Sequence, residues 1–142
     1  MKVDAAELAA RLDEAAVTGT PIPQLADAHR VDVDAAYAVQ QALIVRRTGR
    51  GERLVGVKMG LTSRAKMAQV GVDSPILGQL TDTTQVPDGA AVDISRLIHP
   101  RVEPEIAFLL DRPPTSGMPF TDAVRAVAPA LEVIDSRYRD FT

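Results

Sequence analysis

Glu103 and Glu105 are the residues whose types and spacing first suggest chemistry in this sequence. They lie in an alternating stretch, residues 99–110, where one parity carries the carboxylates and the other is apolar. In a β-strand, side chains at i and i+2 share a face about 7 Å apart, so two long glutamates can converge on one hard cation such as Mg²⁺. A solvated strand with an acidic outer face has the same pattern, so the spacing alone leaves both interpretations open.

A lysine on a second alternating stretch is the other chemical candidate. Lys58 lies within residues 53–61 and shares its parity with Gly56 and Gly60. Two glycines on one strand face leave room for something to approach the backbone, and Lys58 would lie on that open face. An ordinary solvated strand lysine would look the same.

Several other chemistries have no support in the sequence. There is no cysteine, which excludes disulfides, thiolate nucleophiles and zinc–thiolate sites. The two histidines, His29 in a polar loop and His99 before a proline, form no Ser-His-Asp set, and we interpret both as surface residues. No phosphate-binding glycine loop is present.

Length, composition and charge indicate a single globular domain. The chain has 142 residues, of which 46% are hydrophobic and 25% charged. Its formal net charge of −3 gives no general attraction to nucleic acid or to anionic lipid. The N-terminus lacks the apolar core of a signal peptide, and no apolar run approaches the roughly 20 residues that span a bilayer. We therefore expect a cytoplasmic protein without nucleic-acid or membrane partners.

Two helices are expected to precede these strands. Asp4 and Glu7 have the spacing of a capping box ahead of an alanine- and leucine-rich stripe, which predicts a helix that ends at Gly19. After a proline-containing loop over residues 20–30, Asp32 or Asp34 can cap a second helix that runs to about residue 48.

The rest of the chain is expected to be rich in strands. Strands are predicted over residues 53–61, 99–110 and 130–135, with two more short ones on either side of a turn at residues 87–89. Short helices are predicted over residues 62–70 and 122–128, and a turn over residues 72–78. Two helices followed by strands with short helices between them make the fold class α+β.

Three stretches together carry a resemblance to a known family. Residues 56–63, 100–108 and 130–137 read Gly-Val-Lys-Met-Gly-Leu-Thr-Ser, Pro-Arg-Val-Glu-Pro-Glu-Ile-Ala-Phe and Ala-Leu-Glu-Val-Ile-Asp-Ser-Arg. In order and separation they resemble the hydratase and decarboxylase group of the fumarylacetoacetate hydrolase superfamily, enzymes that act late in the meta-cleavage breakdown of catechols. The resemblance runs from about residue 4 to the last residue.

The resemblance implies a fold and its division along the chain. It implies N-terminal helices over residues 1–52, followed over residues 53–142 by the first part of a mixed, β-rich catalytic domain of the fumarylacetoacetate hydrolase type. Because family members are much longer, we expect the chain to be truncated, either as a fragment or as a natural short form.

The resemblance also implies the site. A Mg²⁺ or Mn²⁺ ion would be held by Glu103, Glu105 and Glu132, and Lys58 would line the site as a cationic anchor or proton donor. Near three carboxylates the lysine is expected to keep its charge, because opposite charge favours the charged form. The motif positions further imply substrate-binding residues at Leu61, Thr62, Ser63, Asp73 and Arg137.

One position distinguishes the two activities of the group. The hydratases carry an aspartate in a Pro-Asp-Phe-Gly context, where this chain has Ile76 between Pro75 and Leu77. Isoleucine cannot handle the proton and water that add across an alkene. The chain therefore looks more like the decarboxylases of 2-oxo-3-hexenedioate (4-oxalocrotonate), in which the cation would chelate the 2-oxo acid and act as electron sink while the distal carboxylate leaves as CO₂.

Two alternatives stay open beside the decarboxylase, a carbon–carbon lyase. One is the matching hydratase of 2-oxo-pent-4-enoate; the other is a non-catalytic fragment that binds a partner subunit. The partners implied by the resemblance are a small 2-keto dicarboxylic acid, further copies of the chain in a homo-oligomer, and the pathway hydratase that takes up the unstable dienol product.

Overall fold

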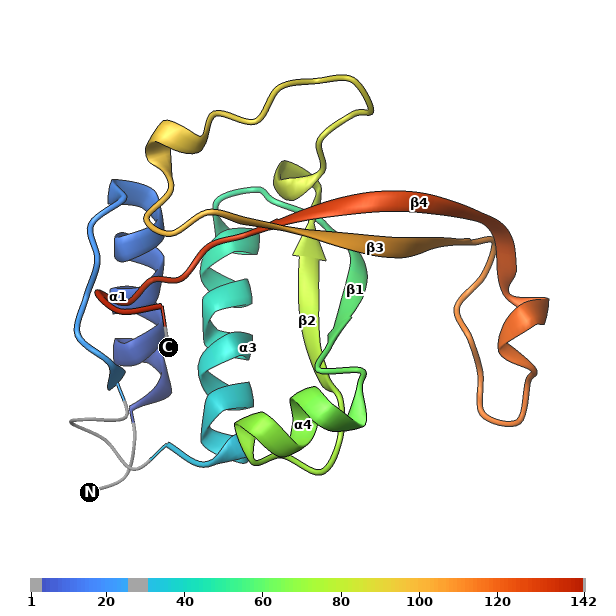
Figure 1. Ribbon diagram of the computed structural model, residues 1–142, viewed down its shortest axis with the longest axis horizontal. Helices are drawn as coiled ribbons and strands as arrows, with labels where there is room; N and C mark the ends of the chain where they lie inside the picture. Colours follow the sequence, from blue (N-terminus) through green and yellow to red (C-terminus); the bar gives the residue numbers. More distant parts are fainter. Residues whose placement is uncertain (1–3, 26–30, 142) are drawn as a thin grey trace.

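A computed structural model describes residues 4–25 and 31–141 of the chain. It is an α+β structure, as predicted, and Figure 1 shows the two long helices side by side at one end, a short hairpin beside them, and a long β-ribbon that crosses this hairpin and extends beyond it. The elements are α1 (Ala5–Thr18), α3 (Val33–Gly49), β1 (Leu54–Gly60), α4 (Arg64–Val70), β2 (Ile76–Thr81), β3 (Arg101–Leu110) and β4 (Val124–Ile134). No helix in the described ranges is long and apolar enough to cross a membrane.

The helix ends follow the capping residues in the sequence. Asp4 accepts hydrogen bonds from the backbone N–H of Ala6 and Glu7 at 3.0 and 3.1 Å, and Gly19 ends α1 with a φ of 62°, where a side chain would be strained. Asp32 caps α3 through the N–H of Ala35 at 2.8 Å. Both helices therefore lie where the sequence predicts them, whereas residues 26–30 of the intervening loop, with His29, lie outside the described residues.

The hydrophobic core of the described chain lies between α1 and α3. Its buried members are Leu8, Ala9, Leu25 and Val39, and Tyr138 from the end of the chain packs against them. Residues 137–139 reach this core through an isolated parallel β-bridge with Ile22. The N–H of Ile22 donates to the carbonyl of Arg137 at 3.0 Å, and the N–H of Arg139 donates to the carbonyl of Ile22 at 2.9 Å.

An ion cluster ties the two helices together. The carboxylate of Asp13 on α1, 5% exposed, accepts from Arg46 Nε at 3.0 Å and from Arg50 Nη1 and Nη2 at 2.5 and 2.9 Å. The hydrogen bond from Arg50 is the main reason that the pKa of Asp13 lies below its usual value, although burial opposes this shift.

A second carboxylate joins the end of α3 to the first hairpin. Glu52 accepts from Arg47 Nε at 2.8 Å and from the hydroxyls of Thr81 and Thr83 at 2.7 Å each. Burial raises the pKa of Glu52, but the hydrogen bonds from Thr83, Thr81 and Arg47 together outweigh it, so the pKa is lowered. The first hairpin is thus held to the helices by hydrogen-bonded charge.

The strands pair as two separate antiparallel hairpins, β1 with β2 and β3 with β4. In the first, Lys58 lies opposite Gly78; in the second, Glu103 lies opposite Glu132 in a register that continues along the ribbon. Directly opposed residues share a face, so these registers decide which side chains can meet.

The helix predicted over residues 122–128 is wrong, because these residues contribute to the long strand β4. In the sequence, Thr121 before Asp122 is typical of a helix N-cap, and Pro129 is typical of a break between a helix and a strand. Instead, residues 120–122 form one 3₁₀ turn, and pairing with β3 carries the strand through Pro129, opposite Ile106. Both strands of a two-stranded ribbon are edge strands, where proline is tolerated.

One further local prediction holds only in part, and another is wrong. The turn predicted over residues 72–78 ends early, because Ile76 already begins β2 opposite Gly60. The two short strands predicted around residues 87–89 are absent from the described chain, which has 3₁₀ turns at Asp82–Thr84 and Ile94–Arg96 instead. Asp82 is held by the backbone and side chain of Arg53, at 3.0 and 2.9 Å, which turns the chain away from a strand.

The strand region leaves much apolar surface uncovered. The chain exposes 10605 Å², whereas a compact monomer of 15.2 kDa exposes about 7,100 Å². One face of the β3–β4 ribbon, here called the apolar ribbon face, consists of the opposed pairs Val102/Val133, Pro104/Leu131, Ile106/Pro129 and Phe108/Val127. Leu131 is 74% exposed and Ile106 66%.

Candidate metal centre

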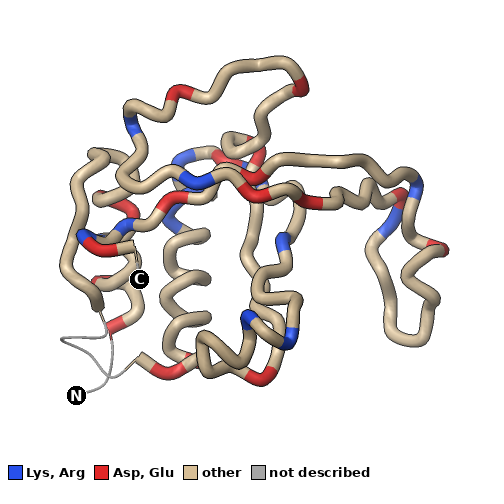
Figure 2. Tube along the Cα trace, in the orientation of Figure 1, with Lys and Arg blue, Asp and Glu red and all other residues tan. Residues whose placement is uncertain are grey.

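Three carboxylates meet on the other face of the β3–β4 ribbon. The register places Glu103 directly opposite Glu132, and Glu105 lies two residues along β3 on the same face. One oxygen from each lies within 4.8 Å of the others, and Figure 2 shows the acidic positions of the ribbon where it passes the first hairpin. Like charges placed directly opposite one another destabilise a strand pair, so positive charge nearby would stabilise this grouping.

The donor set is of the kind that a hard divalent cation prefers. It contains carboxylate oxygens only, with Glu103 and Glu132 half-buried and Glu105 exposed. Next to it the same ribbon face carries small residues, since Ala130 lies opposite Glu105 and Ala128 lies opposite Ala107. The residues present therefore fit a Mg²⁺- or Mn²⁺-type ion.

Lys58 reaches this cluster from the first hairpin. Its ammonium donates to both carboxylate oxygens of Glu132, and the two side chains are 32% and 23% exposed. The structure therefore brings Lys58, Glu103, Glu105 and Glu132 together from two hairpins. Their roles as catalytic residue and metal ligands stay predictions.

Gly78 makes room for the stem of Lys58, and the sequence analysis did not identify it. A Cβ atom added at Gly78 would lie 2.8 Å from Lys58 Cγ, closer than real Cβ atoms come, and 3.3 Å from Cδ. Gly56, by contrast, has only one neighbour at 4.0 Å, an ordinary contact distance. The cross-strand partner, rather than the flanking glycines, lets Lys58 lie across the hairpin, and only the strand register could have indicated it.

A second lysine, Lys66, lies near another carboxylate of the cluster. Lys66 Nζ is 3.9 Å from an oxygen of Glu103, and its side chain is 64% exposed. It belongs to the first turn of α4, where its backbone N–H donates to Ser63 Oγ at 3.2 Å. In the sequence, Lys66 stands out only because it lies three residues after Ser63. This spacing predicts a helix cap rather than a residue of a metal or substrate site.

Among the described residues, no hydrogen bond or ion pair joins the residues predicted to bind substrate to Lys58 or to the three carboxylates. Leu61 follows β1 with a φ of 56°, unusual for a residue other than glycine, and Ser63 caps α4. Arg137 donates to the carbonyl and carboxylate of its neighbour Asp135 at 2.9 and 3.1 Å. Thr62 and Asp73 are exposed.

His99 is half-buried rather than at the surface, which corrects its interpretation. Its Nε2 lies 3.0 Å from the carbonyl oxygens of both Tyr138 and Arg139, and its ring meets Phe141 edge-on. The carboxylate of Asp135 accepts from the backbone N–H groups of Ile98 and His99. These contacts join the segment before β3 to the segment after β4.

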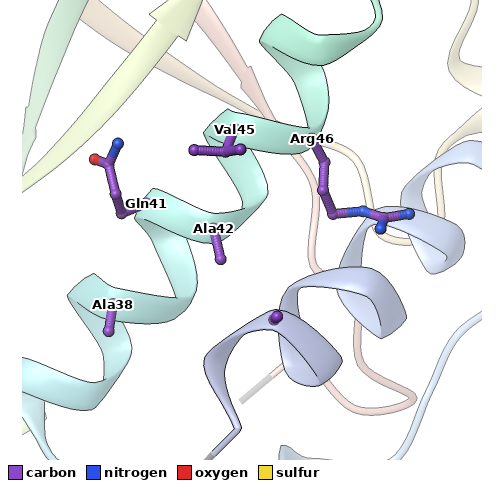
Figure 3. A pocket seen from close by; sticks show the side chains of 6 residues that line it. Ala38, Gln41, Ala42, Val45 and Arg46 are labelled. Carbon is purple, nitrogen blue, oxygen red and sulfur yellow. The ribbon is translucent and has the colours of Figure 1, made fainter.

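The helices carry a hollow of about 500 Å³ that is separate from the carboxylates. Figure 3 shows its lining along one side of α3, with Arg46 extending over α1. Its walls are mainly apolar, and none of the predicted site residues is among them: Ala6, Ala38, Gln41, Ala42, Val45 and Arg46. It offers no set of groups for acid–base or metal chemistry.

Comparisons with known proteins support the motif resemblance, although no family model matches the chain. The chain is 51% identical over 137 residues to a 4-oxalocrotonate decarboxylase from a Pseudomonas species, covering 94% of this chain and 54% of the relative. It is 43% identical over 141 residues to a 2-keto-4-pentenoate hydratase from Burkholderia vietnamiensis, covering 96% of this chain and 54% of that protein.

Solved structures give the same result. The 4-oxalocrotonate decarboxylase from Pseudomonas putida G7, complexed with magnesium and adipate, matches with a TM-score of 0.88 at 42% identity, over 96% of this chain and 54% of that one. The same enzyme complexed with calcium and acetate matches with a TM-score of 0.86 at equal coverage.

The fold and sequence therefore define a homologue of this decarboxylase and hydratase group, and the resemblance inferred from the three motifs is confirmed. Within the group, its identity to the Pseudomonas 4-oxalocrotonate decarboxylase exceeds its identity to the Burkholderia hydratase. The chain spans about half the length of these relatives.

Proposed function

We propose that this chain forms part of a divalent-metal-dependent decarboxylase that converts 2-oxo-3-hexenedioate to 2-hydroxypenta-2,4-dienoate and CO₂. The observation that carries the proposal is the convergence of Glu103, Glu105 and Glu132 within 4.8 Å, beside Lys58. This geometry lies in a chain that is 51% identical to a 4-oxalocrotonate decarboxylase over nearly its whole length.

The three glutamates would hold Mg²⁺ or Mn²⁺ through oxygen alone. The decarboxylase from Pseudomonas putida G7, which has this fold, has been seen with magnesium and with calcium, both hard cations. When bound, such a cation supplies a Lewis acid that withdraws electron density from the 2-oxo acid as the C–C bond breaks.

Lys58 would bind the substrate or move its proton. A protonated lysine beside three carboxylates can anchor a carboxylate of the dicarboxylic acid, or donate a proton to carbon after CO₂ has left. Its stem lies flat over Gly78, which directs the ammonium towards the cluster. Leu61, Thr62, Ser63, Asp73 and Arg137 remain proposed substrate-binding residues by motif position.

Decarboxylation is favoured over hydration by Ile76. It occupies the first position of β2, opposite Gly60, on the hairpin that carries Lys58. A hydratase needs an ionisable group there to handle water and a proton, and an isoleucine side chain has none.

The experiment that tests the proposal supplies both substrates to the same preparation. The protein is incubated with Mg²⁺ and 2-oxo-3-hexenedioate while CO₂ is measured, and in parallel with 2-oxo-pent-4-enoate while water addition is followed. CO₂ release that requires the metal supports the decarboxylase. Water addition without CO₂ release supports the hydratase instead.

A second candidate function, binding of further polypeptide, is favoured by the apolar ribbon face. The surface that the chain exposes beyond a compact monomer, about 3,500 Å², is of the size that obligate interfaces bury. A partner subunit of this kind could be a further copy of the chain, the pathway hydratase, or a polypeptide equivalent to the part of the relatives that this chain does not span.

Replacement of Leu131 or Ile106 by serine tests this candidate. If the apolar ribbon face is a binding surface, either variant should reduce association in sedimentation experiments while Mn²⁺ affinity stays the same. Val17→Ser on α1 is the matched control, since Val17 is 73% exposed but lies away from the ribbon. Equal association of all three variants and the parent chain would argue against binding through this face.

A further inference from the structure

The ion pair between Lys58 and Glu132 uses a carboxylate that the metal centre also needs. The ammonium contacts both oxygens of Glu132, while one of these oxygens belongs to the three-carboxylate set. A divalent cation among the three carboxylates would lie close to this ammonium, and two like charges repel at such separations. Lys58 and the cation cannot both keep their best contacts with Glu132.

The two lysines of the cluster differ in how firmly they are placed. The Lys58 stem is confined over Gly78, and its ammonium contacts Glu132 with both side chains half-buried. Lys66 stands 3.9 Å from Glu103 and is mostly exposed, so solvent screens it and its contribution is small. Only Lys58 is positioned to act as an internal counter-ion.

We propose that Lys58 is an exchangeable counter-ion, which neutralises Glu132 in the cation-free protein and is displaced when a divalent cation binds. Displacement frees the ammonium beside the cation, where it can pair with a carboxylate of an anionic ligand. Metal binding would then convert Lys58 from a partner of the protein into a partner of the substrate. This inference rests on the proposed metal centre and adds an order of events to it.

The proposal predicts that removal of the Lys58 charge strengthens metal binding. Lys58→Met keeps most of the stem and should bind Mn²⁺ roughly tenfold more tightly than the parent chain, since a nearby positive charge no longer opposes the cation. Lys66→Met should change the affinity by less than about twofold, because its charge is exposed and screened. Calorimetric titration with Mn²⁺ alone, with no substrate, measures both.

Gly78→Ala provides a second, independent variant. The added Cβ collides with the Lys58 stem, so the ammonium should lose its contact with Glu132 and Mn²⁺ affinity should rise several-fold. Gly56→Ala, on the neighbouring strand of the same hairpin, is the matched control, because its Cβ would meet nothing closer than 4.0 Å.

The outcomes separate this inference from the function on which it rests. Tighter Mn²⁺ binding in Lys58→Met and Gly78→Ala, but not in the two controls, supports the exchange. Measurable binding by the parent chain with unchanged or weaker binding in both variants overturns the exchange and leaves the metal centre intact. Absence of Mn²⁺ binding by the parent chain overturns the metal centre itself.

Discussion

The helix pair and the β3–β4 ribbon use charge in opposite ways. Between α1 and α3, the buried carboxylate of Asp13 meets two arginines of opposite charge. On the ribbon, Glu103 faces Glu132 with Glu105 beside them, and lysines reach only two of the three. One arrangement lowers the energy of the folded chain, whereas the other accepts repulsion that a bound cation would relieve.

The helix pair and the ribbon also differ in how much apolar surface they bury. The helices bury their stripes against each other and against the tail, while the apolar ribbon face remains open. We therefore expect the residues that stabilise the chain and those of the proposed metal centre to lie in separate regions. Substitutions among the helix charges should change stability and spare metal binding, and substitutions on the carboxylate face should do the reverse.

The largest effect is expected for Lys58→Met on turnover. In metal-loaded, active protein, the loss of a proton donor should lower kcat by roughly 10²–10⁴-fold, while the free energy of unfolding barely changes. Steady-state CO₂ release and urea unfolding measure the two quantities. Because a charged lysine cannot form a Schiff base, borohydride should trap no substrate adduct on Lys58, and a trapped adduct would contradict the assigned role.

Glu105→Gln should affect metal binding next most strongly. Loss of one of three carboxylate ligands should weaken Mn²⁺ binding by at least roughly 10–100-fold, the range already found for outer-shell partners. The cation-free chain should unfold no more easily than the parent, because one of three mutually repelling charges is gone. Unchanged Mn²⁺ affinity in calorimetry would show that Glu105 is no ligand.

Asp13→Asn should lower the stability of the fold and leave metal binding unchanged, the opposite of Glu105→Gln. It removes the carboxylate that Arg46 and Arg50 share, and we expect a loss of about 1–3 kcal/mol of unfolding free energy in urea at neutral pH, with Mn²⁺ affinity unchanged. Glu14→Gln, an exposed position on the same helix, should stay within about 0.5 kcal/mol of the parent chain.

The difference in unfolding free energy between the parent chain and Asp13→Asn should depend on pH. The pKa of Asp13 is lower in the folded chain than its unfolded value of about 3.9, first because of the hydrogen bond from Arg50. Its contribution is therefore fully present above pH 4 and is lost as the pH falls through the folded pKa. The stability difference between the parent chain and Asp13→Asn should shrink below pH 4. A difference that grows there would contradict this.

The smallest effect is expected for Ser63→Ala. Ser63 accepts from the N–H of Lys66 at the start of α4, a helix with no buried residue, so loss of the cap should cost about 0.5–1 kcal/mol and act locally. Faster amide exchange of Lys66, with the core amides of α1 unchanged, would show this. Global destabilisation would mean that α4 supports more of the fold than its contacts indicate.

The sequence predicts most of what depends on neighbours in the chain. Asp4, Gly19, Asp32 and Ser63 begin or end helices through local hydrogen bonds, and the alternation in β3 shows which face carries the glutamates. Local patterns could not predict the full length of β4, because its conformation depends on pairing with β3. This pairing outweighs the helix cap that the local sequence suggests.

The residues of the candidate site also differ in whether the sequence alone reveals them. Glu103 and Glu105 are visible from their spacing, whereas Glu132 joins them only through the register of the ribbon and was identified by motif resemblance. Gly78 and Lys66 were not identified, because both act across hairpins or helices that no local pattern connects. The cytoplasmic location and the division at residue 52 stay predictions.

The bridge between Ile22 and Tyr138 has a consequence for the order in which the chain folds. It pairs residues more than a hundred positions apart and brings Tyr138 onto the core of the helix pair. During synthesis, α1 and α3 emerge early and can form a helical hairpin, but this surface stays uncovered until residues 137–139 have also been made. Contacts of such long sequence separation form slowly, so the pairing of residues 137–139 with Ile22 should follow the formation of the two helices.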